Sequence, residues 1–533
     1  MKKPPPAERF FVSAAWVIGL TALGKALGLL KNIVLASRFG TSAEMDSYLV
    51  AFALVFLLIG WFKLPLRGGF VPLFSKKLEQ EGEAGAWRAA GVFLSNFSVI
   101  VLAVTAAGVI AAPIVVRLVA PGFGDEAYET AVSLTRIMMV GVFFSTIGGL
   151  LTNIYHCYRN FSVPGLVLPA YNAVMVVAAY FLSLRMGIHG LAVGVIGGSV
   201  LQLAIQFPIV WRHREHARFR IDFRHPMFRG VLRLAVPLLI GMAGAKLDGV
   251  IDRVFASMLS EGSISALAYA LRLTELPREI VVLAFSTILF PFFSRIAASG
   301  DLERLGERMM LSIRATFFVL LPVSVAMAML GGPLVRILFQ RGAFDEQSVW
   351  FTVSALLLYT PTIWALGITT IMSAAFMAMQ DTKTPALVGL VRLAVKIGLV
   401  FLFIGRLDHA GVALATSVSH VFKLLVLLFL LPEPLKRGQM RPLLRGLSGA
   451  AGASLIMGLV LFWSSPIVER IGPVRGIQPD IVSLLVLGSA GTVAYLVAAR
   501  FLARRELSEL LNALRDGFRD ILTRRRRPTP PAI

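Results

Sequence analysis

Long apolar blocks without charge constrain this sequence more than any other feature. Tyr171–Leu184 and Ile397–Ile404 contain no charged residue, and each grows into a longer apolar stretch when its neighbours are included. A helix of about 20 apolar residues crosses a hydrocarbon core. In lipid, only helices and closed β-barrels pair all of their backbone groups, and the short alternating strands of a barrel are missing from this sequence. The sequence therefore predicts a bundle of membrane-spanning helices.

Composition and charge distribution agree with a membrane protein. Of 533 residues, 57% are hydrophobic and 15% are charged, so a soluble fold would lack the polar surface to cover its apolar residues. A net charge of +22 would also suit a nucleic-acid-binding protein. The basic residues, however, gather at the ends of apolar segments and on alternate loops, which is the positive-inside pattern. This distribution indicates a membrane topology and no nucleic-acid partner.

An all-α polytopic membrane protein of about fourteen transmembrane helices is predicted. Basic runs such as Arg212–Arg229 and Arg524–Arg527 fall on every second loop or in the tail, so both termini are predicted in the cytoplasm. The predicted spans lie near residues 12–37, 46–66, 91–117, 130–155, 163–184, 187–210, 231–256, 262–291, 311–337, 349–378, 385–405, 409–432, 445–464 and 481–502.

The chain ends and the cysteine content carry separate signals. Met1–Arg9 is basic, but no small-residue cleavage site follows the first apolar segment, so no removable signal peptide is expected. Glu506–Arg527 is predicted to be a charged helix at the anionic cytoplasmic leaflet, or alternatively a partner-binding helix. Cys157 is the only cysteine, which excludes a disulfide within one chain. The leucines on one side of the terminal helix are Leu507, Leu510, Leu511 and Leu514.

Ionisable residues inside the predicted spans identify the candidate site. Each costs about 2.5–3.5 kcal/mol at a helix centre, so a charge retained there is usually paired or faces water. Lys63 and Arg67 close the second span and are candidates for a gate, although snorkelling to the interface is an alternative. Glu275 is also a candidate for an ion-pair cluster that only fixes helix packing. The predicted substrate-binding residues are Lys25, Lys31, Asp46, Arg272 and Glu275.

These charges concentrate in the first, second, seventh and eighth spans. The pattern recurs after six helices and predicts two pseudo-symmetric six-helix lobes followed by a helix pair. The predicted domains are 1–220, 221–435, 436–503 for the helix pair, and 504–533 for a basic cytoplasmic tail. Transporters built from repeats bind their substrate between the halves, and a cavity lined mainly by cations fits a phosphate-bearing anion.

Several short motifs follow one another along the chain. They include Ala120–Phe123 (APGF), Asp252–Ser257 (DRVFAS), Tyr269–Leu273 (YALRL), Leu338–Asp345 (LFQRGAFD) and Asp381–Pro385 (DTKTP). Asp46, followed by Val50, Ala51 and Phe52, and the spaced Pro164, Pro169 and Asn172 complete the set. From about residue 10 to 435, their order resembles the MurJ/MviN family of lipid II flippases, in the multidrug/oligosaccharidyl-lipid/polysaccharide superfamily.

The resemblance implies a function and a mechanism. It implies two six-helix lobes around a cationic cavity, and two further helices that form a groove for a lipid tail. The expected activity is translocation of an undecaprenyl-pyrophosphate-linked peptidoglycan precursor, lipid II, across the cytoplasmic membrane by alternating access. The charged headgroup would pass through the cavity while the prenyl tail stays in lipid, because hydrocarbon excludes charge far more strongly than it excludes the tail.

The chain departs from the family pattern in its first two spans. Lys25 and Lys31 stand where the family has arginine, which keeps the charge but removes the bidentate fork that suits phosphate. Leu58 replaces a family arginine, and Lys63-Leu64-Pro65 replaces a Glu-Gly-Ala motif of the gating region. These departures leave an alternative function open: a flippase for another polyprenyl-linked oligosaccharide, such as an exopolysaccharide or O-antigen unit.

Some family members bind sodium between the seventh, eleventh and twelfth helices. Asp252 and Thr416 match ligand positions there, but Lys396 stands where a neutral ligand is expected. We hypothesise that the Lys396 ammonium replaces the ion by pairing with Asp252. No cofactor is therefore expected, and no other metal site is predicted.

The expected partners are the lipid-linked anionic glycan, the membrane and proteins of cell-wall synthesis, with the chain a monomer in the bacterial cytoplasmic (inner) membrane. A drug/cation antiporter is disfavoured because a cation-lined cavity repels cationic drugs. A scaffold of the cell-wall machinery that transports nothing stays open as a further class. An enzyme is not expected, since the spans show no metal-ligand constellation, nucleophile elbow or phosphate-cradling glycine loop.

Overall fold

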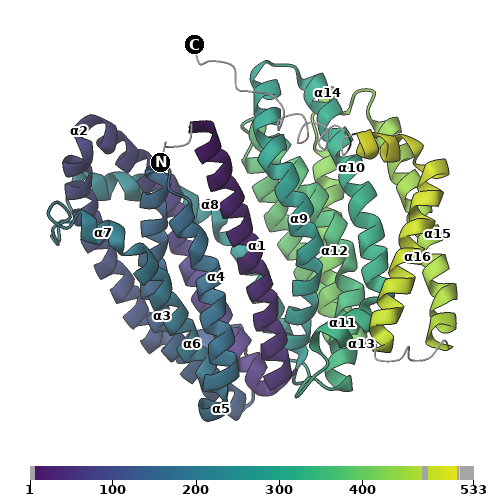
Figure 1. The fold of residues 1–533 in the computed structure, drawn as a ribbon, viewed down its shortest axis with the longest axis horizontal. Coiled ribbons are helices and arrows are strands. Elements are labelled where there is room, and N and C mark those ends of the chain that lie inside the picture. The colour runs from purple at the N-terminus through teal and green to yellow at the C-terminus, as the bar shows by residue number, and fades with distance from the viewer. Residues whose placement is uncertain (1–5, 471–477, 513–514, 516–533) are drawn as a thin grey trace. The chain divides into compact units, whose positions relative to one another are not determined.

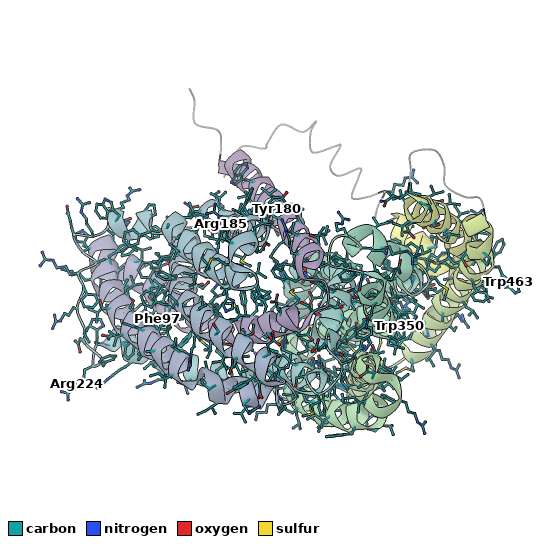
Figure 2. The ribbon with its side chains drawn as sticks, turned by 90° about the horizontal axis from the view of Figure 1, so that it is seen from below. Phe97, Tyr180, Arg185, Arg224, Trp350 and Trp463 are labelled. Carbon is teal, nitrogen blue, oxygen red and sulfur yellow. The ribbon has the colours of Figure 1, made fainter. Side chains whose placement is uncertain are left out.

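The computed structural model describes residues 6–470, 478–512 and 515, and gives the backbone alone for 6–15, 64–65, 237–246, 280–288 and 467–470. Its elements are helices, and no strand occurs among the described residues (Figure 1, and with side chains in Figure 2). In the first half they are α1 (Pro6–Phe39), α2 (Ala43–Val119), α3 (Asp125–Cys157), α4 (Ser162–Val177), the π-helix η1 (Ala178–Leu182), α5 (Ser183–Met186), α6 (His189–Gln206), α7 (Pro208–Arg212) and α8 (Pro226–Ala256). In the second half they are α9 (Ser263–Ala298), α10 (Leu302–Met329), α11 (Gly331–Phe339), α12 (Glu346–Ala378), α13 (Lys383–Phe429), α14 (Glu433–Lys436), α15 (Met440–Arg470) and α16 (Pro479–Leu502).

The long helices agree with the predicted spans. Ten segments of the described chain are long and apolar enough to cross a membrane. Two of them hold two predicted spans each, because α2 is interrupted at Gly82 (φ 69°) and α13 at Asp408 (φ 50°). The predicted spans 231–256 and 262–291 coincide with α8 and α9. The all-helical membrane fold is confirmed, and the number of fourteen crossings stays a prediction.

Internal contacts divide the chain into two compact units. Unit 1 comprises Met1–Ala266 and Phe339–Ser348, and unit 2 comprises Leu267–Leu338 and Val349–Ile533. The division falls within α9, whose first turn belongs to unit 1. The predicted lobes, with boundaries at residues 220 and 435, describe an internal repeat and stay a prediction.

The core of unit 1 forms where α2 packs against α3 and α8. Phe70 and Phe74 of α2 stack on each other, with ring centres 5.4 Å apart, and Trp87 meets Phe74 edge-on. Ile154 of α3 and Phe228 of α8 belong to the same buried cluster. The helices α1, α4 and α6 line up beside one another in this unit (Figure 1). Large aromatic side chains thus pack α2 against α3 and α8.

In unit 2, α15 and α16 pack as a pair beside α10 (Figure 1). Their backbones approach closely at Gly449, where a Cβ atom would overlap the backbone of Leu502. Buried Arg314 of α10 forms an ion pair with Glu506, which follows α16, at 3.3 Å. Small residues and this ion pair hold the terminal helix pair against α10, since apolar association alone gains little inside lipid.

Two leucines of the predicted stripe that follows α16 pack against the protein itself. Leu507 and Leu510 contact the apolar cluster formed by α10, α15 and α16. The predicted position of this segment at the cytoplasmic leaflet stays a prediction. The buried ion pair between Glu506 and Arg314 comes just before these leucines and holds the segment against the helices of unit 2. Most of the predicted terminal helix beyond Asn512 lies outside the described residues.

Part of the Leu338–Asp345 motif closes onto the end of α1 within unit 1. The Ala343 N–H donates to the carbonyl oxygen of Ser37 at 2.8 Å. Gly342 has a φ of +62°, and a Cβ atom there would overlap the same Ser37 oxygen. Just beyond, hydrogen bonds from Ser348 lower the pKa of Asp345, whose carboxylate caps the start of α12. The motif is a close backbone contact that only glycine permits.

We expect Gly342→Ala to lower the melting temperature of the detergent-solubilised protein. The substitution adds a left-handed backbone penalty of about 1 kcal/mol to a steric overlap with Ser37. Gly389→Ala in α13 is the matched control, because a Cβ atom at Gly389 meets no atom within 4 Å. Thermal unfolding monitored by tryptophan fluorescence measures both variants. Equal melting temperatures for the two would contradict the role assigned to this turn.

Candidate transport site

The predicted site residues are divided between the two units, and each set has its own surroundings. Lys31 in α1 is in unit 1, and its ammonium lies 5.6 Å from the ring centre of Phe52 in α2. Phe52 stacks on Phe56 at 4.1 Å between ring centres. The negative face of an aromatic ring stabilises a cation, and more strongly where water is scarce. This aromatic row on α2 gives Lys31 a favourable position within the membrane span.

Lys25 stands six residues before Lys31 on the same helix. At 3.6 residues per turn, this spacing places the two side chains about 120° apart around the helix axis. Lys25 is half-buried next to Gly24, whose carbonyl oxygen accepts a hydrogen bond from Asn172 of α4 at 2.9 Å. Lys25 and Lys31 therefore point in different directions from α1, and their shared role in substrate binding stays a prediction.

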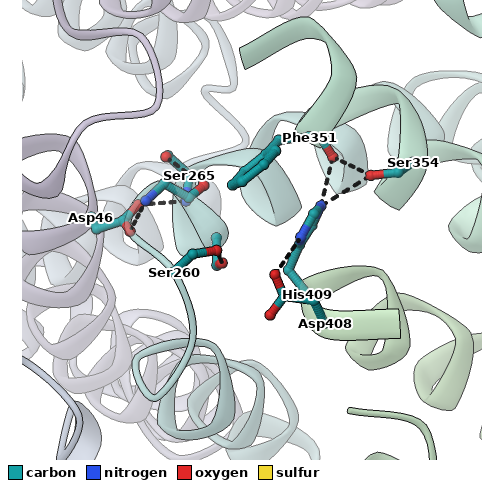
Figure 3. Close-up of polar contacts among 9 residues, drawn as sticks. Asp46, Ser260, Ser265, Phe351, Ser354, Asp408 and His409 are labelled. Atoms are coloured by element: carbon teal, nitrogen blue, oxygen red, sulfur yellow. Dashed lines mark hydrogen bonds and ion pairs between the residues drawn. The ribbon is translucent and has the colours of Figure 1, made fainter. Parts of the chain in front are cut away.

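Asp46 lies in the first turn of α2, where the Ser42 side chain caps the helix. Its carboxylate accepts hydrogen bonds from the backbone N–H groups of Gly262 at 2.8 Å and Ser265 at 2.7 Å (Figure 3). The side chain is only 4% exposed. A carboxylate at a helix N-terminus satisfies donors that the helix leaves unpaired. Asp46 thus ties α2 to the start of α9, and its assignment as a substrate-binding residue stays a prediction.

We expect Asp46→Ala to destabilise unit 1 by about 3 kcal/mol, because it leaves two buried N–H donors without their acceptor. Asp46→Asn keeps one acceptor and should lose about half as much. Asp125→Ala is the control, because Asp125 is an exposed carboxylate in the first turn of α3 and its removal should cost about 0.5 kcal/mol. Chemical unfolding in detergent measures all three. A loss for Asp46→Ala no larger than the control's would refute the capping role.

Lys63 and Arg67, the candidate gate residues, lie one turn apart on α2 in unit 1. The aliphatic part of the Lys63 side chain packs closely against Gly149 of α3, and a Cβ atom at Gly149 would lie 2.8 Å from the Lys63 Cε. Arg67 lines a cavity together with Arg159. The side chains of the intervening Leu64 and Pro65 lie outside the described residues. These contacts direct both cations towards α3, and their gating role stays a prediction.

In unit 2, Arg272 and Glu275 form an ion pair on one face of α9. The Arg272 Nη1 donates to the Glu275 Oε2 at 2.9 Å, and Arg278 approaches the other carboxylate oxygen at 4.0 Å. Glu275 therefore lies between two guanidinium groups of the same helix. Glu275 is thus in an ion pair, and the Arg272 side chain remains 40% exposed. That the pair only fixes helix packing stays a prediction. Substrate contact by either residue stays a prediction.

Lys396 is completely buried in α13, one turn after the buried Arg392. The guanidinium of Arg392 donates to the Ser419 hydroxyl at 3.4 Å, and the Thr416 hydroxyl donates to the Val412 carbonyl oxygen at 2.9 Å. Asp252 belongs to unit 1, so its proposed pairing with Lys396 stays a prediction. Two basic side chains are thus buried within one helical turn of α13.

Sequence reasoning missed His409, which is 2% exposed at the break in α13. Its Nε2 lies 2.9 Å from the Phe351 carbonyl oxygen and 3.0 Å from the Ser354 hydroxyl, and its Nδ1 lies 3.7 Å from the Asp408 carboxylate (Figure 3). These contacts join the turn between the two spans of α13 to α12. The only signal was the polar stretch Arg406–His409 between two apolar blocks.

Solved structures show which fold this protein shares. The structure titled lipid II flippase MurJ, inward closed conformation, matches with a TM-score of 0.75 at 26% identity and covers 92% of this chain and 98% of that chain. An inward-facing multidrug resistance MATE family transporter of the MOP superfamily matches with a TM-score of 0.64 at 17% identity, over 80% of this chain and 95% of that one. The fold is that of a MOP superfamily transporter.

Sequence comparison gives the family. The model of the family lipid II flippase MurJ matches residues 35–476. The lipid II flippase MurJ of Burkholderia cenocepacia is 30% identical over 463 residues, which cover 84% of this chain and 88% of that protein. The probable lipid II flippase MurJ of Rhizobium tropici is 29% identical over 416 residues, or 75% and 77% of the two chains. The chain belongs to the lipid II flippase MurJ family, which confirms the resemblance found in its motifs.

Proposed function

We propose that this protein translocates lipid II, a polyprenyl-pyrophosphate-linked peptidoglycan precursor, across the bacterial cytoplasmic membrane. The observation that carries the proposal is family membership over residues 35–476. Relatives that cover most of the chain are named for lipid II transport, as in Burkholderia cenocepacia. A flippase for another polyprenyl-linked oligosaccharide is therefore not favoured, although the departures at Leu58 and Lys63-Leu64-Pro65 motivated that alternative.

The physical task is to carry a pyrophosphate and its sugars past hydrocarbon while the prenyl tail stays in lipid. Burying the charged headgroup without partners would be prohibitive, so cationic side chains must replace its water. The planar guanidinium of Arg272 can form two hydrogen bonds to one phosphate group, and the side chain is accessible because it is 40% exposed. Lys25 and Lys31 add point charges without that geometry. Alternating access would present these cations to each side of the membrane in turn.

The topology and partners follow from the same proposal. Both termini lie in the cytoplasm, because the basic loops must face that side. The protein acts on the lipid-linked glycan as a monomer, works beside proteins of cell-wall synthesis, and transports its substrate without chemical conversion.

Complementation tests the proposed function. We expect the wild-type gene to restore growth when the endogenous lipid II flippase of a host bacterium is depleted. Arg272→Ala and Lys31→Ala should fail at equal membrane abundance, since loss of one phosphate-binding cation costs about tenfold or more in transport. Arg304→Ala, at an exposed arginine in the first turn of α10, should rescue growth as the wild type does.

Each outcome separates the candidate functions. A wild-type protein that reaches the membrane but fails to rescue growth would favour another polyprenyl-linked glycan as the substrate. Rescue by the charge-reversed Arg272→Glu would contradict transport through a cationic site and favour a scaffold.

We also propose that the Lys396 ammonium takes the place of a bound sodium ion. Full burial of Lys396 in α13 supports a fixed internal cation, because a buried charge needs a permanent partner within the protein. Transport in proteoliposomes should be the same in sodium and choline buffers. Lys396→Ala should lose transport in choline by about tenfold, since removal of one partner leaves a buried carboxylate uncompensated. Lys76→Ala, on the cytoplasmic stretch of α2, is the control.

Two results would contradict this substitution of a side chain for an ion. The first is sodium-dependent transport by the wild type. The second is undiminished transport by Lys396→Ala without sodium. Lys396→Met, which keeps most of the side-chain volume, separates loss of charge from loss of packing.

A further inference from the structure

We propose that a cationic cavity in unit 1 binds the phosphate-bearing headgroup of an anionic membrane lipid. The cavity measures about 610 Å³ and lies between α2, the end of α3 and the turn that leads into α4. Its volume falls in the range of small-molecule sites. Every lining residue belongs to unit 1, so the site is complete within that unit.

The charge of the lining favours an anion. Arg67 of α2 and Arg159 of the turn after α3 contribute two guanidinium groups, and His156 adds a ring that donates hydrogen bonds. Glu79 is the one carboxylate among the lining residues. Within the described part of the chain, neither guanidinium forms an ion pair with Glu79 or with any other acidic side chain. Two guanidinium groups not neutralised by the protein are a typical arrangement for holding phosphate.

The backbone at Arg159 supports a functional role for its side chain. Arg159 has a φ of 56°, a left-handed conformation that glycine or asparagine adopts much more readily than arginine. The neighbouring Asn160 fixes this turn, because its side-chain oxygen accepts the N–H groups of Ser162 at 3.2 Å and Val163 at 3.4 Å and so starts α4. An arginine held in a strained position at the wall of a cavity indicates that its guanidinium is used there.

The apolar part of the lining selects a lipid over free phosphate. Val71, Leu78 and Phe161 line the same cavity as the cations. The Phe161 ring is 47% exposed and lies 5.1 Å from the His156 ring between centres. A soluble phosphate would leave these side chains in water, whereas a phospholipid covers them with the first carbons of its chains. The mixed lining therefore fits an amphiphile.

The position of the cavity agrees with a lipid of the cytoplasmic leaflet. Arg67 directly follows the predicted span 46–66, and Arg159 follows the span 130–155, so both stand at a membrane–water interface. The distribution of basic loops assigns that interface to the cytoplasmic side, where anionic headgroups attract basic residues. This site would act whether or not the protein transports lipid II, because none of the predicted substrate-binding residues lines it.

The only cysteine of the chain provides a native probe, since Cys157 lines the cavity. We would measure the rate at which a maleimide alkylates Cys157 in nanodiscs of phosphatidylcholine, with and without about 30% phosphatidylglycerol. We expect phosphatidylglycerol to slow alkylation about fivefold, because the bound headgroup covers the thiol. Millimolar inorganic pyrophosphate in neutral nanodiscs should give no comparable protection.

Three variants tie the protection to the cavity. Arg67→Gln and Arg159→Asn each remove one charge, and asparagine tolerates the left-handed backbone at Arg159. For each variant, the alkylation rate of Cys157 is compared between the two bilayers. Each single variant should lose most of the protection by phosphatidylglycerol, and the double variant should lose all of it. Arg88→Gln, at an exposed arginine of α2 outside the cavity, should keep full protection.

Three results would overturn the proposal. Equal alkylation rates of the wild type in the two bilayers would show that no lipid occupies the cavity. Full protection in the double variant would assign the effect to the general surface charge of the bilayer. Protection by pyrophosphate as strong as that by phosphatidylglycerol would make the ligand a soluble phosphate.

Discussion

Hydrocarbon supplies no hydrogen-bond partner, so the protein itself must satisfy each polar group within its spans. Asp46 meets this requirement through two backbone N–H groups at the start of α9, and Arg314 meets it through Glu506. His409 does so through α12. The first two contacts join segments that are distant in the sequence, and the third joins the consecutive helices α12 and α13. The cost of an unpaired polar group in lipid thus decides which helices stay together.

Exposure separates the charges that hold the fold from those that remain accessible. Asp46 is 4% exposed and Arg314 6%, and both have fixed partners. Arg272 is 40% exposed although it pairs with Glu275, and Arg67 and Arg159 face a cavity. Removing the partner of a buried ion costs several kcal/mol of free energy, while a partly exposed ion can exchange one partner for another at small cost. Ligand binding therefore belongs to the second group.

The sequence predicted the helices well and the long-range contacts poorly. Apolar blocks in the sequence correspond directly to segments that lie in lipid. The predicted spans therefore agree with the helices from α1 to α16. Asp46 and its partner Gly262 are 216 residues apart, and no periodicity encodes such a distance. Leu507 and Leu510 showed the correct amphipathic spacing but not the surface they cover. The cavity between Arg67 and Arg159 likewise exists only after α2 and α3 have packed.

The motifs that reveal the family mark points where the chain closes on itself. A Cβ atom at Gly122 of the APGF motif would overlap the backbone of Ser257 and Met258, just as one at Gly342 would overlap Ser37. In the DTKTP motif, hydrogen bonds from Thr384 lower the pKa of Asp381, whose carboxylate caps the start of α13. Such contacts fix loops, and none of these residues needs to touch a substrate.

This division explains why the family is clear while the predicted substrate-binding side chains differ from its pattern. Steric contacts and hydrogen bonds fix the residues where the chain closes on itself. The proposed function places a looser demand on Lys25 and Lys31, since a phosphate group responds to positive charge from either a lysine or an arginine. Under that proposal, hydrogen bonding of one phosphate group by both arms of a guanidinium falls to the accessible arginines, and Arg272 is the one among the predicted substrate-binding residues.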